Sequence, residues 1–304
     1  MKGFKVINPG MLSLIQDAGR YGFHRMGITT GGPFDSYSFT WANQLCENQD
    51  SAACLEILAG GLVLESQIKT QVAITGADVP IKINDNQVEG WCTQTVVPGD
   101  RISIGYATAG CRAYFAVVGG IQSPLIFGSA STVVREGLGG LHKNGQPLQQ
   151  GDILPCHTKQ IANMHSIPEQ HRLIFNTDVT EVRMVLGYQY TQFSASQLDQ
   201  FFSAEYTISP QSDRMGYRLK GPAIKPPNSE MLSEGICLGA VQLPADGQPI
   251  ILLCDRQTIG GYPKLGSVLS LDIAKLAQLM PGRKLRFTPI DIDRAQNLLR
   301  QSTQ

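Results

Sequence analysis

The feature that most constrains the fold of this chain is a short unit that recurs along it, a glycine turn followed by a strand. In each copy, glycine supplies the positive φ that a tight turn often needs, and the residues after it alternate between apolar and polar as in a half-buried strand. A chain that repeats this unit is expected to fold mainly into β-sheets. The unit is clearest in PGDRISIG (98–105), QGDILP (150–155) and PGRKLRFT (281–288).

Further strands are predicted in the same way, and helices are few. The apolar run at 112–120 is typical of a fully buried strand, and residues 81–91 contain an Asn-Asp-Asn turn between two strands. The strands are not separated by the helical stretches of a βαβ protein, so barrels or sandwiches are favoured. The predicted helices follow Asp35 as an N-cap, begin at Ser196, and cover 271–280 and 291–300.

The chain is long enough for two domains. Residues 157–172 are polar, show weak periodicity and contain Pro168, so we interpret them as a linker. We therefore expect two mainly β halves, comprising residues 1–170 and 171–304.

Composition excludes several classes of function. The 25 Lys and Arg residues balance the 25 Asp and Glu residues, and no basic run exceeds two residues, so no nucleic-acid partner is expected. No apolar run approaches the roughly 20 residues that cross a bilayer, and the first residues lack the apolar region of a signal peptide. We therefore expect a cytoplasmic protein with no membrane partner.

Cysteine and histidine patterns predict neither a disulfide framework nor a metal site. The seven cysteines are odd in number and scattered, no C-x-x-C pair occurs, and buried reduced thiols are expected. The five histidines form no H-x-x-x-H or H-E-x-x-H pattern, so no metal is predicted.

Polar and glycine residues are concentrated first between residues 16 and 35, with five glycines in 20 positions. Glycines let backbone N–H groups approach a ligand, and the interleaved acids and arginines are suited to orienting a carboxylate or an amide. An irregular loop braced by ion pairs is the alternative. The glycine spacing does not match a nucleotide-binding motif. The predicted substrate-binding residues here are Gln16, Asp17, Arg20 and Asp35.

A second concentration lies in three segments of the other half, 212–219, 233–250 and 255–264. The last segment follows the apolar run PIILLC, so its charged residues emerge directly from a predicted core strand. Burying a charged side chain costs free energy unless the charge is paired or takes part in binding or catalysis. The alternative is an Asp–Arg brace that ties a loop to the barrel. The candidate residues are Arg214, Tyr217, Glu234, Gln242, Asp255, Arg256, Thr258 and Lys264.

Taken together, these segments resemble the biotin-dependent carboxyltransferase family of allophanate hydrolase subunit 2 type. The matching segments run in the family's order from about residue 5 to residue 290. This sequence departs from the family's pattern just before Asp35. Pro33 and Phe34 stand there, where the family usually has a small residue before the corresponding aspartate. The segments that carry the resemblance include QDAGRYG, RAYFAVVGGI, GSAST, SDRMGYRL, SEGI, GAVQLP, GQPIILL and DRQTIGGYPK.

The resemblance implies two cyclophilin-like β-barrel halves with a few short helices. The family includes the C subunit of the bacterial ATP-dependent 5-oxoprolinase, which implies that 5-oxoprolinase subunits B and A are partners and that the assembled complex uses ATP to open 5-oxo-L-proline to L-glutamate. On this reading the chain is an amide (lactam) hydrolase subunit that is active only in complex. We expect the charged loops of both halves to face one cleft, which a partner subunit completes.

The chemistry of that reaction suggests roles for the candidates. Phosphorylating the lactam oxygen requires cations around developing negative charge and a carboxylate to orient the nucleophile. Arg214, Arg256 and Lys264 are predicted for the first role, and Asp255 or Glu234 for the second. The remaining candidates, Gln16, Asp17, Arg20, Asp35, Tyr217, Gln242 and Thr258, are predicted to bind the substrate.

Two alternatives stay open. Family domains in biotin-dependent urea carboxylases receive a carboxyl group from carboxybiotin, but this chain has no Met-Lys-Met tripeptide and so no predicted biotin attachment site. The family also includes the antagonist of the sporulation kinase inhibitor, so a non-catalytic regulatory binding protein is the second alternative.

Overall fold

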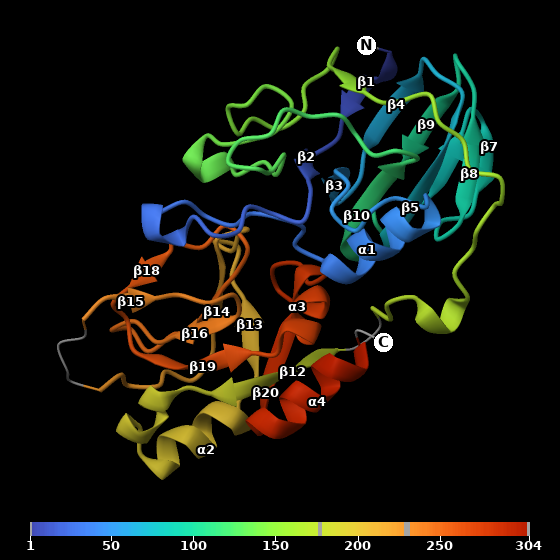
Figure 1. Cartoon of the computed structure of the whole chain (residues 1–304). Coiled ribbons are helices and arrows are strands. Elements are labelled where there is room, and N and C mark those ends of the chain that lie inside the picture. The colour runs from blue at the N-terminus through green and yellow to red at the C-terminus, as the bar shows by residue number, and fades with distance from the viewer. Residues whose placement is uncertain (1, 176–177, 228–231, 303–304) are drawn as a thin grey trace. The chain divides into compact units, whose positions relative to one another are not determined.

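The computed structural model describes residues 2–175, 178–227 and 232–302, and its fold is mainly β, as predicted (Figure 1). It separates into two compact units. The first comprises residues 1–23 and 30–176, and the second comprises residues 24–29 and 177–304. The second unit therefore includes six residues of the glycine-rich segment that the sequence places in the first half.

The first unit contains two sheets whose inner faces share one apolar core. Phe4, Leu64 and Ile102 contribute from one sheet, and Leu55 and Phe115 from the other. The six-stranded sheet has the order β11 (Ile153–Pro155), β1 (Gly3–Pro9), β4 (Leu62–Ser66), β9 (Arg101–Ile104), β6 (Ile81–Ile83) and β7 (Asn86–Val88). The five-stranded sheet has the order β2 (Leu12–Gln16), β3 (Cys54–Leu58), β10 (Ala109–Val117), β5 (Thr70–Asp78) and β8 (Thr93–Val96).

Helix α1 (Ser36–Leu45) covers the other face of the five-stranded sheet. Its apolar residues pack in a second core that includes Tyr114 and Ala116 of β10. The N-cap is Asp35, whose carboxylate accepts hydrogen bonds from the backbone N and the hydroxyl of Ser38 at 3.0 and 2.6 Å. The predicted cap is confirmed, and β10 is buried from Cys111 to Val117, in agreement with the buried strand predicted at 112–120.

The stretch at 157–172, interpreted as a linker, is part of the first unit. The Thr70 hydroxyl donates to the carbonyl of Lys159 at 2.9 Å, and the backbone N of Thr93 donates to the carbonyl of His165 at 2.8 Å. Ile167 is buried in the core beside α1. This stretch therefore lies along the β5 and β8 edge of the five-stranded sheet, where polar residues satisfy backbone groups.

The second unit contains a closed barrel of seven strands. Strands β12 and β20 pair in parallel, whereas the other barrel pairs are antiparallel. A two-stranded ribbon pairs β15 (Glu234–Gly235) with β18 (Ile259–Gly260). The barrel order is β12 (Val179–Leu186), β19 (Lys264–Val268), β16 (Ala240–Gln242), β17 (Ile250–Leu252), β14 (Gly216–Lys220), β13 (Tyr206–Ile208) and β20 (Lys284–Pro289).

The helices of the second unit lie near where the sequence predicts them, with their ends shifted by one to three residues. Helices α2 (Ala195–Ser203), α3 (Ser270–Ala277) and α4 (Ile292–Ser302) are present, but α2 begins one residue earlier than expected. Its N-cap is Ser194, which forms a capping box with Gln197. Short 3₁₀ turns in the two units are η1 (His24–Met26), η2 (Val134–Glu136), η3 (Glu169–His171) and η4 (Tyr188–Gln192).

The cysteines are free, and most are buried as predicted. Cys92 is half-buried, and Cys237 is exposed, so the expectation of burial is wrong for Cys237. Its sulfur lies 3.0 Å from the Ser267 hydroxyl. Among the described residues, no helix is long and apolar enough to cross a membrane.

Candidate functional site

In the first unit, the Asp17 carboxylate accepts hydrogen bonds only from neutral donors within the described part of the chain. Oδ1 accepts from the hydroxyls of Ser129 and Ser131 at 2.5 and 2.6 Å and from the backbone N of Gly19 at 2.9 Å. Oδ2 accepts from the backbone N of Ala130 at 2.6 Å. Asp17 is only 8% exposed. Hydrogen bonding of this kind stabilises an ionised carboxylate and fixes the loop around it.

The partner of Asp17 is the GSAST segment, which is one of the segments that carry the family resemblance but is not among the predicted site residues. It forms no helix, because Ser129 and Ser131 turn their hydroxyls toward the carboxylate instead. Neither serine is exposed to solvent. A carboxylate acceptor satisfies such buried hydroxyls. Two serines in one short glycine-containing segment were the only signal in the sequence.

Arg20 is buried next to the Asp17 cradle, by which we mean Asp17 and the groups that donate hydrogen bonds to its carboxylate. Its Nη2 donates to the carbonyl of Ser131 at 2.6 Å, and its Nε donates to the carbonyl of Ile126 at 3.3 Å. A Cβ at Gly139 would lie 2.8 Å from Nη2 and 2.0 Å from the Ser131 oxygen, so only glycine fits there. Gln16 is also buried, and its Nε2 donates to the carbonyl of Thr132 at 3.0 Å. The structure thus brings together three of the four predicted residues of this half.

Asp35, the fourth, lies in a separate buried cluster that sequence reasoning missed. Glu56 Oε2 accepts from the Tyr114 hydroxyl at 2.6 Å and from the backbone N of Phe34 at 2.8 Å. The backbone N of Asp35 donates to the same tyrosine oxygen at 2.8 Å. Arg112 lies over the Phe34 ring, 4.1 Å from its centroid, with its Nε 3.8 Å from Glu56. Burial and then the neighbouring carboxylates raise the pKa of Tyr114 well above its usual range, so it stays protonated.

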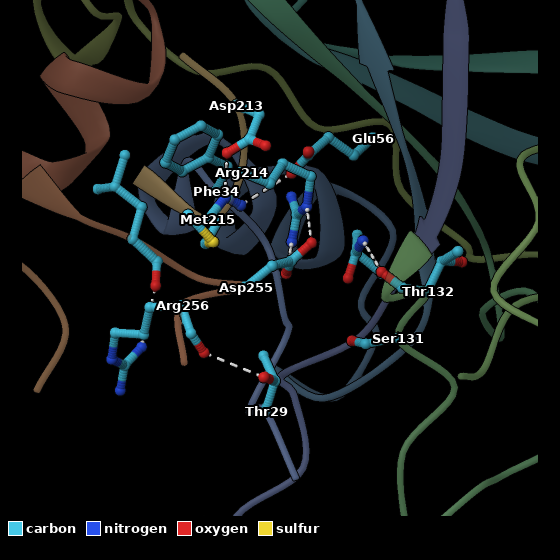
Figure 2. A network of polar contacts seen from close by, with 12 residues as sticks. Thr29, Phe34, Glu56, Ser131, Thr132, Asp213, Arg214, Met215, Asp255 and Arg256 are labelled. Atoms are coloured by element: carbon cyan, nitrogen blue, oxygen red, sulfur yellow. Dashed lines mark hydrogen bonds and ion pairs between the residues drawn. The ribbon is translucent and has the colours of Figure 1, made fainter. Parts of the chain in front are cut away.

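In the second unit, Arg214 and Asp255 form a buried bidentate pair (Figure 2). Nε and Nη2 of the guanidinium each donate to a different carboxylate oxygen at 3.0 Å. The two side chains are 9% and 6% exposed. The backbone N of Asp255 also donates to the carbonyl of Arg214 at 2.9 Å. The alternative reading of an Asp–Arg brace therefore describes this geometry.

Arg256 points back into its own unit. Its Nε donates to the carbonyl of Ile236 at 3.1 Å, and its Nη1 donates to the carbonyl of Leu253 at 3.1 Å. The carbonyl of Arg256 accepts from the Thr29 hydroxyl at 3.0 Å (Figure 2). Burial, and then the charge of Arg256, lowers the pKa of His24. The glycine-rich segment thus supplies Thr29 and His24 to the surroundings of Arg256.

Lys264 and Glu234 form a second ion pair, more accessible than the first. Nζ lies 2.8 Å from Glu234 Oε1, and the side chains are 14% and 24% exposed. The Tyr188 hydroxyl donates to Oε2, and Gln189 Nε2 donates to Oε1 at 3.3 Å. Burial raises the pKa of Glu234, but hydrogen bonds from Lys264 and Tyr188 outweigh it and hold the pKa below its ordinary value. Tyr188 and Gln189 were not predicted, because both precede the polar segments of this half.

The remaining candidates of the second unit, Gln242, Tyr217 and Thr258, differ in their hydrogen-bond partners. Gln242 is 1% exposed, and its Nε2 has no hydrogen-bond partner within the described part of the chain. A Cβ at Gly260 would lie 3.0 Å from that nitrogen. The Tyr217 hydroxyl donates to the carbonyl of Leu279 at 3.1 Å, and the carbonyl of Thr258 accepts a backbone hydrogen bond. The Gln242 side-chain amide therefore keeps unused N–H donors within the described part of the chain.

The five charged residues predicted in the second unit thus divide between the Arg214–Asp255 pair with Arg256 and the Glu234–Lys264 pair. In residues 2–175, 178–227 and 232–302, no group of three or more His, Cys, Asp or Glu side chains is arranged to hold a metal. The cleft that the sequence analysis expects the two units to share stays a prediction.

Comparison with known proteins places these clusters in a family. The chain is 36% identical over 293 residues to the C subunit of 5-oxoprolinase from Escherichia coli (strain K12), covering 96% of this chain and 92% of that protein. It is 33% identical over 289 residues to the protein of the same name from Haemophilus influenzae, covering 95% and 91%. Two independent relatives therefore match along nearly their whole length.

The fold also matches a solved structure, that of the urea amidolyase from K. lactis. The TM-score is 0.90 at 29% identity, and the match covers 100% of this chain but only 20% of that chain. A family model described as carboxyltransferase domain, subdomain A and B, matches residues 26–289. The chain therefore belongs to the carboxyltransferase domain family, as the resemblance of its sequence motifs had indicated.

Proposed function

We propose that this chain is the C subunit of an ATP-dependent 5-oxoprolinase complex, which opens 5-oxo-L-proline to L-glutamate in the cytoplasm. The observation that carries the proposal is the match over 92% of the C subunit of E. coli 5-oxoprolinase. A match of this extent supports a separate subunit with the same partners, subunits B and A. The chain acts only in that complex, and the complex consumes ATP.

Within this proposal, Glu234 is a better candidate than Asp255 for orienting the nucleophile. Both Asp255 oxygens are used by Arg214, and that pair is almost fully buried. Glu234 is more exposed, and its lowered pKa keeps it ionised at neutral pH. A partly exposed carboxylate is able to accept a hydrogen bond from water. Lys264, its partner, supplies positive charge at the same place.

Arg214 and Arg256, like Asp255, are buried, so within this proposal they act through their charge and do not bind the substrate directly. Both guanidinium groups use their N–H donors on a carboxylate or on backbone carbonyls of their own unit. Their positive charge still contributes to the local potential, which favours developing phosphate charge. We propose that Gln242 donates its amide N–H to the lactam, because that nitrogen is buried and carries no partner in the described chain.

The proposal is tested with the assembled complex. The chain is co-produced with subunits B and A, and ATP-dependent turnover of 5-oxoproline is measured for Glu234→Gln and Lys264→Met. We expect kcat to fall about 10²-fold or more for either variant, as for loss of one charge-stabilising group. Lys220→Met is the matched control, since Lys220 is exposed on β14. Unchanged turnover in both variants excludes these roles, and absence of turnover in the wild-type complex excludes the function.

Carboxyl transfer is the second candidate, and one observation favours it. The whole chain superimposes on part of the K. lactis urea amidolyase with a TM-score of 0.90. If this chain transfers a carboxyl group from a biotin carrier on another polypeptide, avidin will inhibit ATP-linked turnover of urea by the complex. Turnover of 5-oxoproline that is insensitive to avidin excludes this alternative.

A further inference from the structure

The first unit contains a pocket that none of the candidate site residues lines. Its volume is about 300 Å³, and it lies where the second half of β5 meets the corner leading into β6. Ile74, Ala77, Ile81 and Trp91 provide apolar lining. Ligand pockets run from roughly 300 to 1,000 Å³, so this one suits a small metabolite rather than a nucleotide.

The lining is fixed by the backbone. The N–H of Trp91 donates to the carbonyl of Ile74 at 2.7 Å, and the N–H of Ile167 donates to the carbonyl of Trp91 at 2.8 Å. These bonds hold Trp91 at φ 58°, in the left-handed region that a bulky residue rarely adopts. The N–H of Thr108 donates to the carbonyl of Asp78 at 2.8 Å. The pocket is therefore preformed, which lowers the entropic cost of binding.

Two side chains of opposite charge line the pocket, and both have unused hydrogen-bonding capacity. Arg172 directs Nε and Nη2 to the carbonyl of Ile167 at 3.3 and 3.2 Å, and its Nη1 has no partner among the residues that the structure describes. The carboxylate of Asp78 likewise accepts no hydrogen bond from the described chain. Burial raises the pKa of Asp78 and the nearby Arg172 opposes that shift, so the two charges interact without forming an ion pair.

We propose that this pocket binds a free α-amino acid with an aliphatic side chain. The ligand's carboxylate pairs with Arg172, its ammonium group pairs with Asp78, and its side chain contacts Ile74, Ile81 and Trp91. A zwitterion pairs with both charges at once, whereas a simple acid or a simple amine pairs with only one of them. No proposed catalytic or substrate-binding residue lines the pocket, so this is a separate binding site that does not depend on the proposed function.

The first test varies the ligand. Trp41→Phe leaves Trp91 as the single tryptophan of the chain, so its fluorescence reports on the pocket directly. L-leucine, N-acetyl-L-leucine and L-leucine methyl ester are titrated into this variant, and isothermal titration calorimetry repeats the series on the wild type. We expect saturable binding of L-leucine and binding at least about tenfold weaker for each derivative, which lacks one charge. No saturable binding of L-leucine, or equal binding of all three, overturns the proposal.

The second test varies the protein. Asp78→Asn and Arg172→Gln are each expected to weaken L-leucine binding at least about tenfold. The matched controls Asp85→Asn and Arg101→Gln change exposed residues of the same unit outside the pocket and are expected to bind L-leucine as the wild type does. Asp78→Asn preserves side-chain shape, so it stays informative if Arg172→Gln disturbs the bonds to Ile167. Wild-type affinity in both pocket variants overturns the assignment.

Discussion

Each unit contains a buried aspartate, and the two aspartates differ in the groups that donate hydrogen bonds to them. In the first, Asp17 is surrounded by hydroxyl and backbone N–H donors. In the second, Asp255 faces the guanidinium of Arg214 in a bidentate pair. Neutral donors stabilise the carboxylate but leave its charge, whereas the arginine also neutralises it.

The difference teaches which of these groups are suited to contacting a substrate. Asp17 has four donors on its two oxygens, so it is better suited to holding the GSAST segment than to binding a ligand. The Asp255 pair is equally closed. Glu234 and Lys264 are partly exposed, so under the proposed function they are the pair that we expect a substrate to reach.

The largest expected effect follows from breaking the ion pair. Asp255→Ala leaves the Arg214 charge buried without its carboxylate, and we expect the free energy of unfolding to fall by about 3–5 kcal/mol in urea titrations. Replacing both residues, as Arg214→Met with Asp255→Leu, should recover most of the loss, because no charge is then left buried. A loss below about 1 kcal/mol for the single variant would show that the pair does not stabilise this unit.

Asp17→Asn tests the neutral cradle. The amide presents an NH₂ group to donors that need an acceptor, so at least one buried hydroxyl or N–H loses its partner. We expect a loss of about 2–3 kcal/mol in the free energy of unfolding. Asp85→Asn, at an exposed turn, should stay within about 0.5 kcal/mol of the wild type. If the two variants were equally stable, the four hydrogen bonds to the Asp17 carboxylate would make no net contribution to the free energy of unfolding.

Asp272, another buried carboxylate of the second unit, predicts a pH dependence. Burial raises its pKa, but hydrogen bonds from Arg183 and the charge of Lys275 lower it below its ordinary value. Such a group stabilises the fold above its unfolded pKa of about 3.9, and the contribution is lost as pH falls through the lower folded pKa. We expect Asp272→Asn to destabilise the protein by about 1.5–2 kcal/mol at pH 7.

The acid side of the stability profile checks this prediction. Unfolding free energies of the wild type and of Asp272→Asn, measured by urea titration at a series of pH values, should converge as pH falls below about 4. A constant difference between them at every pH would mean that protonation of Asp272 is not coupled to folding.

The smallest expected effect concerns the start of α2. Ser194→Ala removes the side-chain acceptor of the capping box and should cost about 1 kcal/mol. Ser196→Ala, at the start that the sequence suggests, should cost less than about 0.5 kcal/mol, because within the described residues its hydroxyl forms a hydrogen bond only with that of Ser194. Urea unfolding of both variants decides between the two positions, and an equal or larger cost at Ser196 would contradict the observed cap.

Local patterns predicted most of the fold. Glycine turns followed by alternating residues mark β9, β11 and β20, and Asp35 marks the start of α1. These features depend on residues within a few positions of one another. The linker interpretation of 157–172 fails for the opposite reason, since those residues bind to β5 and β8 through hydrogen bonds to residues about 70–90 positions away.

The candidate site was predicted less well, because its contacts join distant segments. Asp17 and Ser129 are 112 residues apart, and nothing in either segment indicates the other. Glu56 stands in the strand CLEIL, where an acid between apolar residues was the available signal for a buried cluster. Arg214 and Asp255 were recognised as candidates by residue type, but their bidentate geometry required the structure.

The grouping of residues 24–29 with the second unit has a consequence for dissecting the protein. A polypeptide cut at residue 176 separates these six residues from the unit that contains their partners, including the carbonyl that Thr29 binds. The C-terminal fragment alone would thus lack the Thr29 hydroxyl that donates to the carbonyl of Arg256, next to the Asp255 pair. A circularly permuted or split version of the chain must keep that peptide with its barrel to preserve the native surroundings of Arg256.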